Sequence, residues 1–240
     1  MGGSGFPDDP AYPTVTGTQE FKLESEGLLG YGSGDQVTSW VDDWNSHDFV
    51  DGGDAGKVAA HSVWNDESGV LMSGAQTDGL DVDRGTALGI QSGLTVFFLI
   101  KTGTISGAGA NSTILQAARG PTTSRMSFVA RRDAAGNYLA YWDASANWLE
   151  TSTSLSDNTS YIISYRSDNS SLKVAVNGGA EEAIGNPVHQ QQELYHLGMS
   201  NGGAEPFIGH IGAAIWYRTH ISDADRQLVR DYLNAKYSIY

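Results

Sequence analysis

The chain has 240 residues, 40% of them hydrophobic, so it is long enough for one large β domain with a packed core. Its 28 acidic residues against 14 basic residues give a formal net charge of −14, which argues against nucleic-acid partners. The absence of cysteine excludes disulfides, thiol catalysis and cysteine metal sites. No stretch approaches the roughly 20 apolar residues of a membrane span, and we expect no membrane partner.

Residues 1–18 are predicted to form an extended N-terminal arm. Pro7, Pro10 and Pro13 fall in this stretch and disfavour a helix. The stretch has neither the basic start nor the apolar centre of a signal peptide, so we expect synthesis in a cytoplasm without the usual secretion route. Such an arm can lie on a neighbouring subunit, and we expect a homo-oligomer.

A series of strands is predicted for most of the remaining chain. Residues 20–83 are rich in turns, and an apolar run, "LTVFFLIK", starts at Leu94. Further on, "LKVAVNGG" alternates apolar and polar residues with period two and ends in a turn. Runs of this kind recur about every ten residues with turns between them, which is typical of a sandwich or jelly roll. We predict one all-β domain over residues 19–240.

A single helix is predicted at the end of the chain, over residues 222–237. Ser222 is a good N-cap, and Asp225 follows three residues later, as in a capping box. Leu228, Val229, Tyr232 and Leu233 recur at helical spacing and form an apolar stripe. A lone helix of this length is marginal in water, so we expect it to dock on the sandwich.

The closing segment, "FIGHIGAAIWYRTHISDADRQLVRDYLNAKY", resembles the end of bacterial and viral laminin-G-like domains of the concanavalin A-like lectin/glucanase superfamily. The residues at matching places are Phe207, Gly209, Ile211, Tyr217, Arg218, Ser222 and Tyr232. Upstream, "VTSWVDDWNSHDF", "MSGAQTDGLDV" and "GLTVFFLIK" are similar to successive segments of the same family. The resemblance implies a concanavalin A-like jelly-roll β-sandwich closed by one C-terminal α-helix.

Two departures limit what the resemblance implies about function. The family's usual glycine after the early Asp-x-Ser is replaced in "DDWNSHD", and Ala214 stands where the family has a glutamate. Family roles tied to those positions are therefore not carried over. The fold hosts many functions, so the helix indicates the fold and not the activity.

The sequence shows none of the motifs of glycan hydrolysis or zinc catalysis. Glycanases of the superfamily place paired carboxylates on one strand, as in E-x-D-x-x-E, and no strand here has this pattern. Glu20, Glu24 and Glu26 precede the main sandwich, and Glu181 and Glu182 fall in a predicted turn. The six histidines include no H-E-x-x-H. We therefore expect no catalytic residues and a protein that is not an enzyme.

Calcium is the one cofactor that the sequence suggests, because acidic loops can supply hard oxygen ligands. Laminin-G-like domains often bind calcium, so the resemblance favours such a site. The residues to which we assign it are Asp78, Asp81 and Asp83, with Asp42, Asp43 and Asp48 as a second group. The alternative is that these aspartates are solvated and form turns.

A glycan site is predicted around "YLAYWDASANWLE". Trp142 and Trp148, with Tyr141 and Asp143, can stack on a sugar ring and bind its hydroxyl groups. The alternative is structural, with Trp142 packed into the core and Trp148 covering a core edge.

The leading functional hypothesis is a non-enzymatic surface protein of a virus particle, of the bacteriophage capsid-decoration or tail-fibre type. It would dock on neighbouring virion subunits through the arm, as a trimer by analogy, and could also bind surface glycans. The first alternative is a carbohydrate-binding or adhesion module on a cell surface or outside the cell. The second alternative is a glucanase-type hydrolase.

Overall fold

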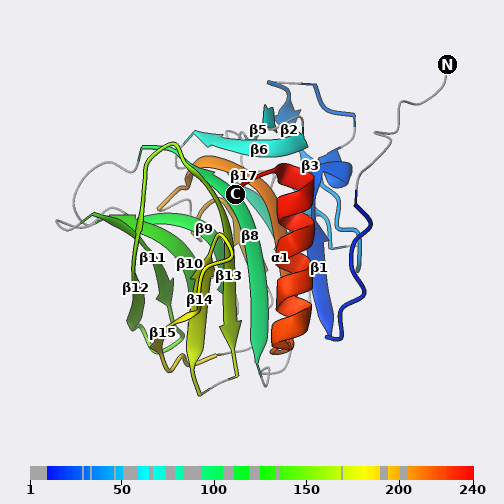
Figure 1. Ribbon diagram of the computed structural model, residues 1–240. Coiled ribbons are helices and arrows are strands. Elements are labelled where there is room, and N and C mark those ends of the chain that lie inside the picture. The colour runs from blue at the N-terminus through cyan, green and yellow to red at the C-terminus, as the bar shows by residue number, and fades with distance from the viewer. Residues whose placement is uncertain are drawn as a thin grey trace.

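The computed structural model describes residues 10–28, 30–32, 34–45, 47–50, 59–64, 67–73, 79–83, 93–104, 111–118, 125–132, 136–168, 170–189, 194–200 and 205–240, except the side chains of 59–64, 67, 73, 83 and 125. Two antiparallel sheets stack face to face, and one helix lies outside them (Figure 1). The predicted all-β jelly-roll sandwich with a C-terminal helix is confirmed. The described part of the chain contains no helix with the length and apolar composition of a membrane span.

The first sheet, called sheet A, has the order β15-β14-β13-β8-β17-β6-β5-β2, with β1 also paired to β17. Its strands are β1 (Gln19–Leu23), β2 (Gln36–Val37), β5 (Ala59–Trp64), β6 (Glu67–Ser73), β8 (Leu94–Thr102), β13 (Ser160–Ser167), β14 (Leu172–Val176), β15 (Glu182–Gly185) and β17 (Ile208–Tyr217). The long strand β17 pairs with β6 through its first residues and with β1 through its last. One edge of β17 therefore holds two separate segments of the chain.

The second sheet, called sheet B, has the order β12-β11-β10-β9-β16-β7-β4-β3. Its strands are β3 (Ser39–Trp40), β4 (Phe49–Val50), β7 (Leu80–Asp83), β9 (Asn111–Ala118), β10 (Arg125–Arg132), β11 (Asn137–Trp142), β12 (Trp148–Leu155) and β16 (Leu194–Leu197). A 3-10 helix, η1 (Ser25–Leu28), follows β1. The chain crosses repeatedly between the sheets, so residues distant in sequence meet on each face.

Strand β8 is apolar along its length because both of its faces are buried. Val96 and Phe98 belong to the core between the two sheets. Phe97 and Leu99 belong to a second core on the opposite face of sheet A. Period-two alternation sends successive side chains to opposite faces, so a strand that is covered on both sides must be apolar throughout.

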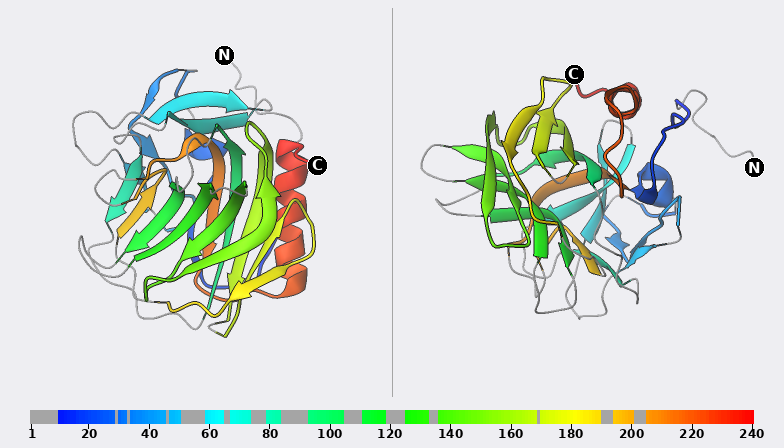
Figure 2. Two further views of the ribbon diagram at one scale, coloured as in Figure 1. Left: turned by 90° about the vertical axis from the view of Figure 1, so that its left-hand side faces the viewer. Right: turned by 90° about the horizontal axis from the view of Figure 1, so that it is seen from below.

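The second core lies beneath α1 (Asp223–Tyr237), on the face of sheet A that points away from sheet B (Figure 2). Ser222 caps the helix: its Oγ accepts from the backbone N–H of Asp225 at 3.0 Å. Val229 and Leu233 are fully buried. The predicted stripe was wrong at Leu228, which is 46% exposed, because this residue lies at the edge of the buried arc.

Residues 10–18 of the predicted arm pack on their own chain beside α1, and residues 1–9 lie outside the described residues. The hydroxyls of Tyr12 and Tyr217 are 2.6 Å apart, and Tyr12 makes an edge contact with Tyr232. The backbone N–H of Arg218 donates to the carbonyl of Thr18 at 2.7 Å. Contact of the arm with another subunit stays a prediction.

A polar cluster lies at the junction of β1, η1 and α1. Glu24 is fully buried and accepts from Lys22 Nζ at 2.6 Å and from the Tyr232 hydroxyl at 3.0 Å. Burial raises the pKa of Glu24 above its ordinary value, although Lys22 acts in the opposite direction. Lys236 Nζ pairs with Glu26. These contacts tie the last helix to the first strand.

Candidate functional site

The outer face of sheet B carries a row of polar and aromatic side chains, which range from buried (Gln116, Ser127, His196) to half-buried (Asp81, Trp142, Trp148). One row crosses six neighbouring strands in register. Its members, from β7 to β12, are Asp81, His196, Gln116, Ser127, Trp142 and Trp148. Hydrogen bonds follow the row, since His196 Nδ1 lies 2.7 Å from Asp81 and Gln116 Nε2 donates to Ser127 at 3.0 Å.

A cavity of about 190 Å³, called the aromatic cavity, lies at the β12 end of this row. Its lining residues are Asn111, Ser127, Trp142, Trp148 and Glu205. The two tryptophan rings meet edge to face with their centroids 4.7 Å apart. Both rings are half-buried, because each is held by its neighbour on one side and faces the cavity on the other.

The polar groups of the aromatic cavity are mainly acceptors. Asn111 Nδ2 donates to Glu205 Oε1 at 2.7 Å, and the other side-chain atom, Asn111 Oδ1, is buried without a hydrogen-bond partner in the described structure. Glu205 adopts φ 53°, a left-handed conformation that is uncommon for a residue other than glycine. Backbone conformations of this kind gather at ligand sites, where the surrounding structure maintains them.

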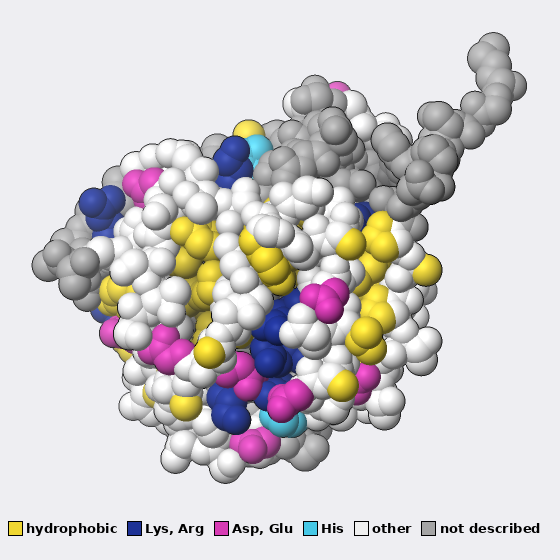
Figure 3. Space-filling model, viewed as in Figure 1, with side chains coloured by type: hydrophobic (Ala, Val, Ile, Leu, Met, Phe, Trp, Pro, Cys, Tyr) yellow, Lys and Arg dark blue, Asp and Glu magenta, His cyan; other side chains and the backbone are white. Residues whose placement is uncertain are grey.

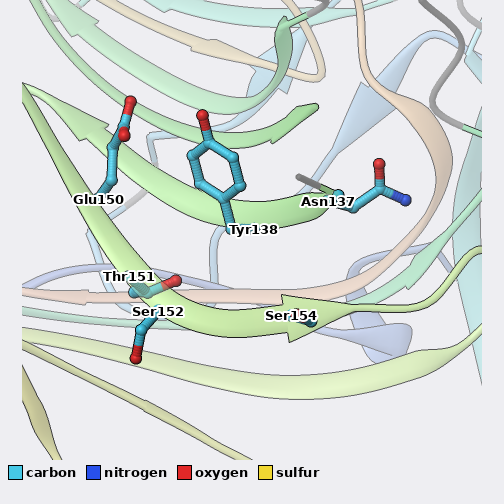
Figure 4. Close-up of a pocket in the computed structure, with 7 residues that line it drawn as sticks. Asn137, Tyr138, Glu150, Thr151, Ser152 and Ser154 are labelled. Carbon is cyan, nitrogen blue, oxygen red and sulfur yellow. The ribbon is translucent and has the colours of Figure 1, made fainter. Parts of the chain in front are cut away.

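A second hollow continues beside the aromatic cavity at the bulge between β11 and β12. It measures about 220 Å³, and its walls include Tyr138, Glu150 and Ser154. Figure 4 shows Tyr138 and Glu150 standing side by side and pointing to the same side of the strands. The guanidinium of Arg131 pairs with Glu150 and lies 4.6 Å from the centre of the Trp148 ring. One cation therefore links the two hollows.

Of the four predicted glycan residues, the structure brings Trp142 and Trp148 together on the outer face. The structural alternative for Trp142 was wrong, because Tyr141 takes the inward position of β11 and is fully buried. Asp143 is also buried, and its Oδ1 accepts from the backbone N–H groups of Ser145 and Asn147 at 2.9 Å each. Tyr141 and Asp143 therefore position the loop between the tryptophans and do not line the cavity.

A chain of hydrogen bonds connects a serine, a histidine and a tyrosine beneath this loop. Ser167 Oγ lies 2.8 Å from His189 Nε2, and the Tyr141 hydroxyl lies 3.3 Å from His189 Nδ1. Burial lowers the pKa of His189 to about 4, with Asp143 acting in the opposite direction. Ser167 and Tyr141 have no exposed surface, so this chain joins the two sheets and is closed to a substrate.

The predicted calcium site at Asp78, Asp81 and Asp83 stays a prediction. Asp78 and the side chain of Asp83 lie outside the described residues, and Asp81 is bonded to His196. In the second group, Asp42 accepts backbone N–H bonds within its own loop, as the turn-forming alternative predicts.

Among the described residues, Asp43, Glu24 and Glu26 bring carboxylate oxygens within 4.8 Å of one another. Lys22 pairs with Asp43 and Glu24, and Lys236 pairs with Glu26, so each of these carboxylates already bonds an ammonium group. This group does not fit a calcium ion well, because its carboxylate oxygens are already engaged by the two lysines.

Sequence reasoning did not identify Asn111, Ser127, Arg131 or Glu205 as site residues. Asn111 and Glu205 are 94 residues apart and meet because the segment that precedes β17 runs past β9. The short side chain of Ser127 also carries no sequence signal by itself. The one sequence feature that pointed to Glu205 was its place in a polar turn, where left-handed backbone conformations occur. Such turns are too common to identify a single site residue.

No protein-family model and no curated protein sequence matches the chain. Solved structures do match it. One is domain 4 of AbnA, an extracellular GH43 arabinanase from Geobacillus stearothermophilus, in complex with arabinotriose, with TM-score 0.62 and 15% identity over 90% of this chain and 98% of that chain. Another is a GH54 α-L-arabinofuranosidase, with TM-score 0.65 and 10% identity over 96% of this chain and 61% of that one. A third is Trypanosoma rangeli sialidase, with TM-score 0.61 and 13% identity over 93% of this chain and 33% of that one.

These likenesses show the fold, which is a jelly-roll β-sandwich. The chain spans about a third of the sialidase and less than two thirds of the arabinofuranosidase. The prediction that the chain is not an enzyme is contradicted, because structures with this fold belong to glycoside hydrolases of families GH43 and GH54 and to a sialidase. The finer resemblance to laminin-G-like domains stays a prediction, and these comparisons give no support to a virion role.

Proposed function

We propose that the chain is a carbohydrate-binding β-sandwich whose aromatic cavity takes a neutral sugar ring. The observation that carries this proposal is the outward-facing pair of Trp142 and Trp148 beside the acceptors Asn111 and Glu205. An indole face stacks on the apolar C–H face of a sugar, and acceptors in the same wall receive its hydroxyl protons. The fold supports the proposal, since domain 4 of AbnA was solved with arabinotriose.

The size of the cavity and its polar groups favour a particular kind of ligand. At about 190 Å³ it is smaller than the ~300–1,000 Å³ of typical small-molecule sites, which suits one ring at the end or branch of a glycan. A carboxylated sugar would meet the carboxylate of Glu205 and be repelled. Asn111 Oδ1 has no partner in the described structure and would gain a hydrogen bond from a sugar hydroxyl.

The test is calorimetric titration with arabinotriose and a panel of neutral oligosaccharides. We expect saturable binding, and a loss of affinity of roughly 30-fold in Trp148→Ala or Trp142→Ala, the size of an anchor residue at an interface. Tyr240→Ala is the matched control, because Tyr240 is an aromatic residue that is 52% exposed and lies outside the cavity. Wild-type affinity in both tryptophan variants, with the fold intact by circular dichroism, would refute the site.

Hydrolysis at the same face is the second candidate function. Glu205 lines the aromatic cavity, and Glu150 lines the adjoining hollow on the other side of Trp148. Glycoside hydrolysis uses two carboxylates that flank the scissile bond. Release of reducing ends by the wild type, lost in both Glu205→Gln and Glu150→Gln, would assign this activity. Release that persists in both variants would place any catalysis elsewhere.

Attachment to a bacteriophage particle, and a trimer built through the arm, stay predictions from the sequence. Co-sedimentation with particles and the mass of the pure protein by light scattering would test them. A monomer that never associates with particles would exclude this role.

A further inference from the structure

The second hollow, which adjoins the aromatic cavity, lies at an irregularity in β12. From Tyr138 to Ala140 the strand β11 advances two residues, while its partner β12 covers four, from Ser154 to Glu150. The two extra residues of β12 interrupt the ladder between the strands, and the hollow of about 220 Å³ lies at this place. Bulges are over-represented beside functional sites, where they re-aim side chains.

Side-chain hydrogen bonds fix the shape of this bulge. Thr151 is buried, and its hydroxyl accepts from the backbone N–H of Leu139 and donates to the carbonyl of Leu139, each at 3.2 Å. From β15, Glu182 accepts from the backbone N–H of Ser152 at 2.6 Å and from the hydroxyl of Thr153 at 3.2 Å. The second hollow is therefore held by the folded chain itself, and a pre-formed site costs a ligand less to enter.

The walls of the second hollow carry groups that suit a sugar. The half-buried ring of Tyr138 stands beside Glu150, and both point to the same side of the strands (Figure 4). The side chain of Glu150 is 38% exposed although it pairs with Arg131, and the neighbouring Ser154 is also exposed. A tyrosine ring offers an apolar face for stacking, and carboxylate and hydroxyl oxygens accept the protons of sugar hydroxyl groups.

The charge of Glu150 is offset by its pairing with Arg131. On the face that carries α1, acidic and basic side chains also lie next to one another (Figure 3). There, Arg166 pairs with both Glu181 and Asp223. A carboxylate that is paired in this way keeps its hydrogen-bonding oxygens but repels less, and so it suits a neutral ligand with hydroxyl groups.

The second hollow and the aromatic cavity follow one another along the same strands. Trp148 lines the aromatic cavity and Glu150 lines the second hollow, and the two share a face of β12 about 7 Å apart. On β11, Trp142 and Tyr138 are four residues apart, which places them on one face at about 14 Å. The guanidinium of Arg131 lies over Trp148 and also pairs with Glu150. A ligand that reaches both hollows must be longer than one sugar ring.

We infer that the second hollow binds further rings of the glycan whose end ring occupies the aromatic cavity, so that the ligand is a neutral oligosaccharide chain. This inference rests on the proposed function. The ring of Tyr138 stacks on a sugar of this chain, and Glu150 and Ser154 accept hydrogen bonds from its hydroxyl groups. Once the end ring is bound, the contacts in the second hollow form within one complex and add to the affinity.

The experiment is calorimetric titration of the whole chain with sugars of increasing length. One series is L-arabinose, arabinobiose and arabinotriose, and a second is glucose, cellobiose and cellotriose. We expect the trisaccharide of one series to bind roughly tenfold or more tightly than its monosaccharide, because only the longer chain reaches the second hollow. Equal affinities of monosaccharide and trisaccharide would overturn the inference and leave the proposed function standing. No binding of any neutral sugar would overturn both.

Matched variants assign the gain in affinity to the second hollow. Tyr138→Ala is expected to weaken trisaccharide binding by roughly tenfold and monosaccharide binding much less, because the lost ring contacts only the longer ligand. Tyr138→Phe keeps the stacking ring and should retain most of the affinity. Trp148→Ala is expected to weaken both sugars, since it changes the aromatic cavity. Tyr240→Ala is the control, as an exposed aromatic residue outside both hollows.

Two results with these variants would contradict the inference. If Tyr138→Ala weakens the monosaccharide as much as the trisaccharide, or weakens neither, the second hollow is not a separate part of the sugar site. If Tyr138→Phe loses as much trisaccharide affinity as Tyr138→Ala, the ring does not stack on the ligand. Circular dichroism of each variant confirms that the fold is intact before the affinities are compared.

Discussion

The outer faces of the two sheets differ in what covers them, although their strands follow the same alternating pattern. On sheet A, Phe97, Leu99 and Ile215 point outward and are buried beneath α1 and the arm. On sheet B, Ser127 and Trp142 point outward and no helix of the described residues lies over them, although Ser127 is buried and Trp142 is half-buried. The outward face on which α1 packs is apolar, whereas the outward face of sheet B carries polar and aromatic side chains, of which the two half-buried tryptophans line the aromatic cavity.

The largest expected effect comes from a substitution in the core between α1 and sheet A. Leu233→Ala removes a fully buried side chain of α1 and should lower the free energy of unfolding by about 2–5 kcal/mol. Leu228→Ala is the control on the same helix, since Leu228 is 46% exposed and its loss should cost within about 0.5 kcal/mol. Urea denaturation followed by circular dichroism measures both. Equal costs would mean that α1 does not cover sheet A as described.

A smaller effect is expected at the contact between the two sheets, where His189 hydrogen-bonds with Ser167 of β13 and with Tyr141 of β11. Because burial lowers the pKa of His189 to about 4 from an ordinary 6.5, the unfolded chain binds more protons between these values. The contribution of neutral His189 to the free energy of unfolding is therefore complete above about pH 6.5. It is lost as the pH falls towards about 4, by up to about 3 kcal/mol.

Urea denaturation of wild type and His189→Gln across pH 4–7 measures this contribution. The stability of the variant should depend less steeply on pH than that of the wild type. Parallel curves would show that His189 titrates alike in the folded and unfolded states. His220→Gln provides a comparison with an exposed histidine of the loop before α1.

The smallest expected effect concerns how the covering helix begins. Ser222→Ala removes the side-chain oxygen that caps the backbone N–H of Asp225 and should lower the free energy of unfolding by about 1 kcal/mol. Ser156→Ala, at an exposed serine whose side chain makes no hydrogen bond within the described residues, is the matched control. Thermal unfolding gives the melting temperature of each variant. An equally small shift of this temperature in both would show that the Ser222 cap contributes nothing to stability.

The sequence by itself determined the class of fold and its final element. The apolar run at Leu94 is a strand buried on both faces, and the helix starts after Ser222 as its capping pattern predicted. These features are local, since strand alternation and helix caps involve residues a few positions apart. The sequence also predicted that Trp142 and Trp148 belong to one site, because a short turn brings them into register.

Only the tertiary structure decided which face each residue occupies. In "NYLAYW", both alternating phases end in an aromatic residue, so the pattern could not tell whether Tyr141 or Trp142 points inward. The structure places Tyr141 in the core because sheet A packs on that side. Asn111 of β9 meets Glu205 in the segment before β17, and Lys101 of β8 meets His210 through pairing with β17, although these segments are distant in sequence. Such pairings depend on how the whole sandwich closes, and no local pattern in the sequence specifies them.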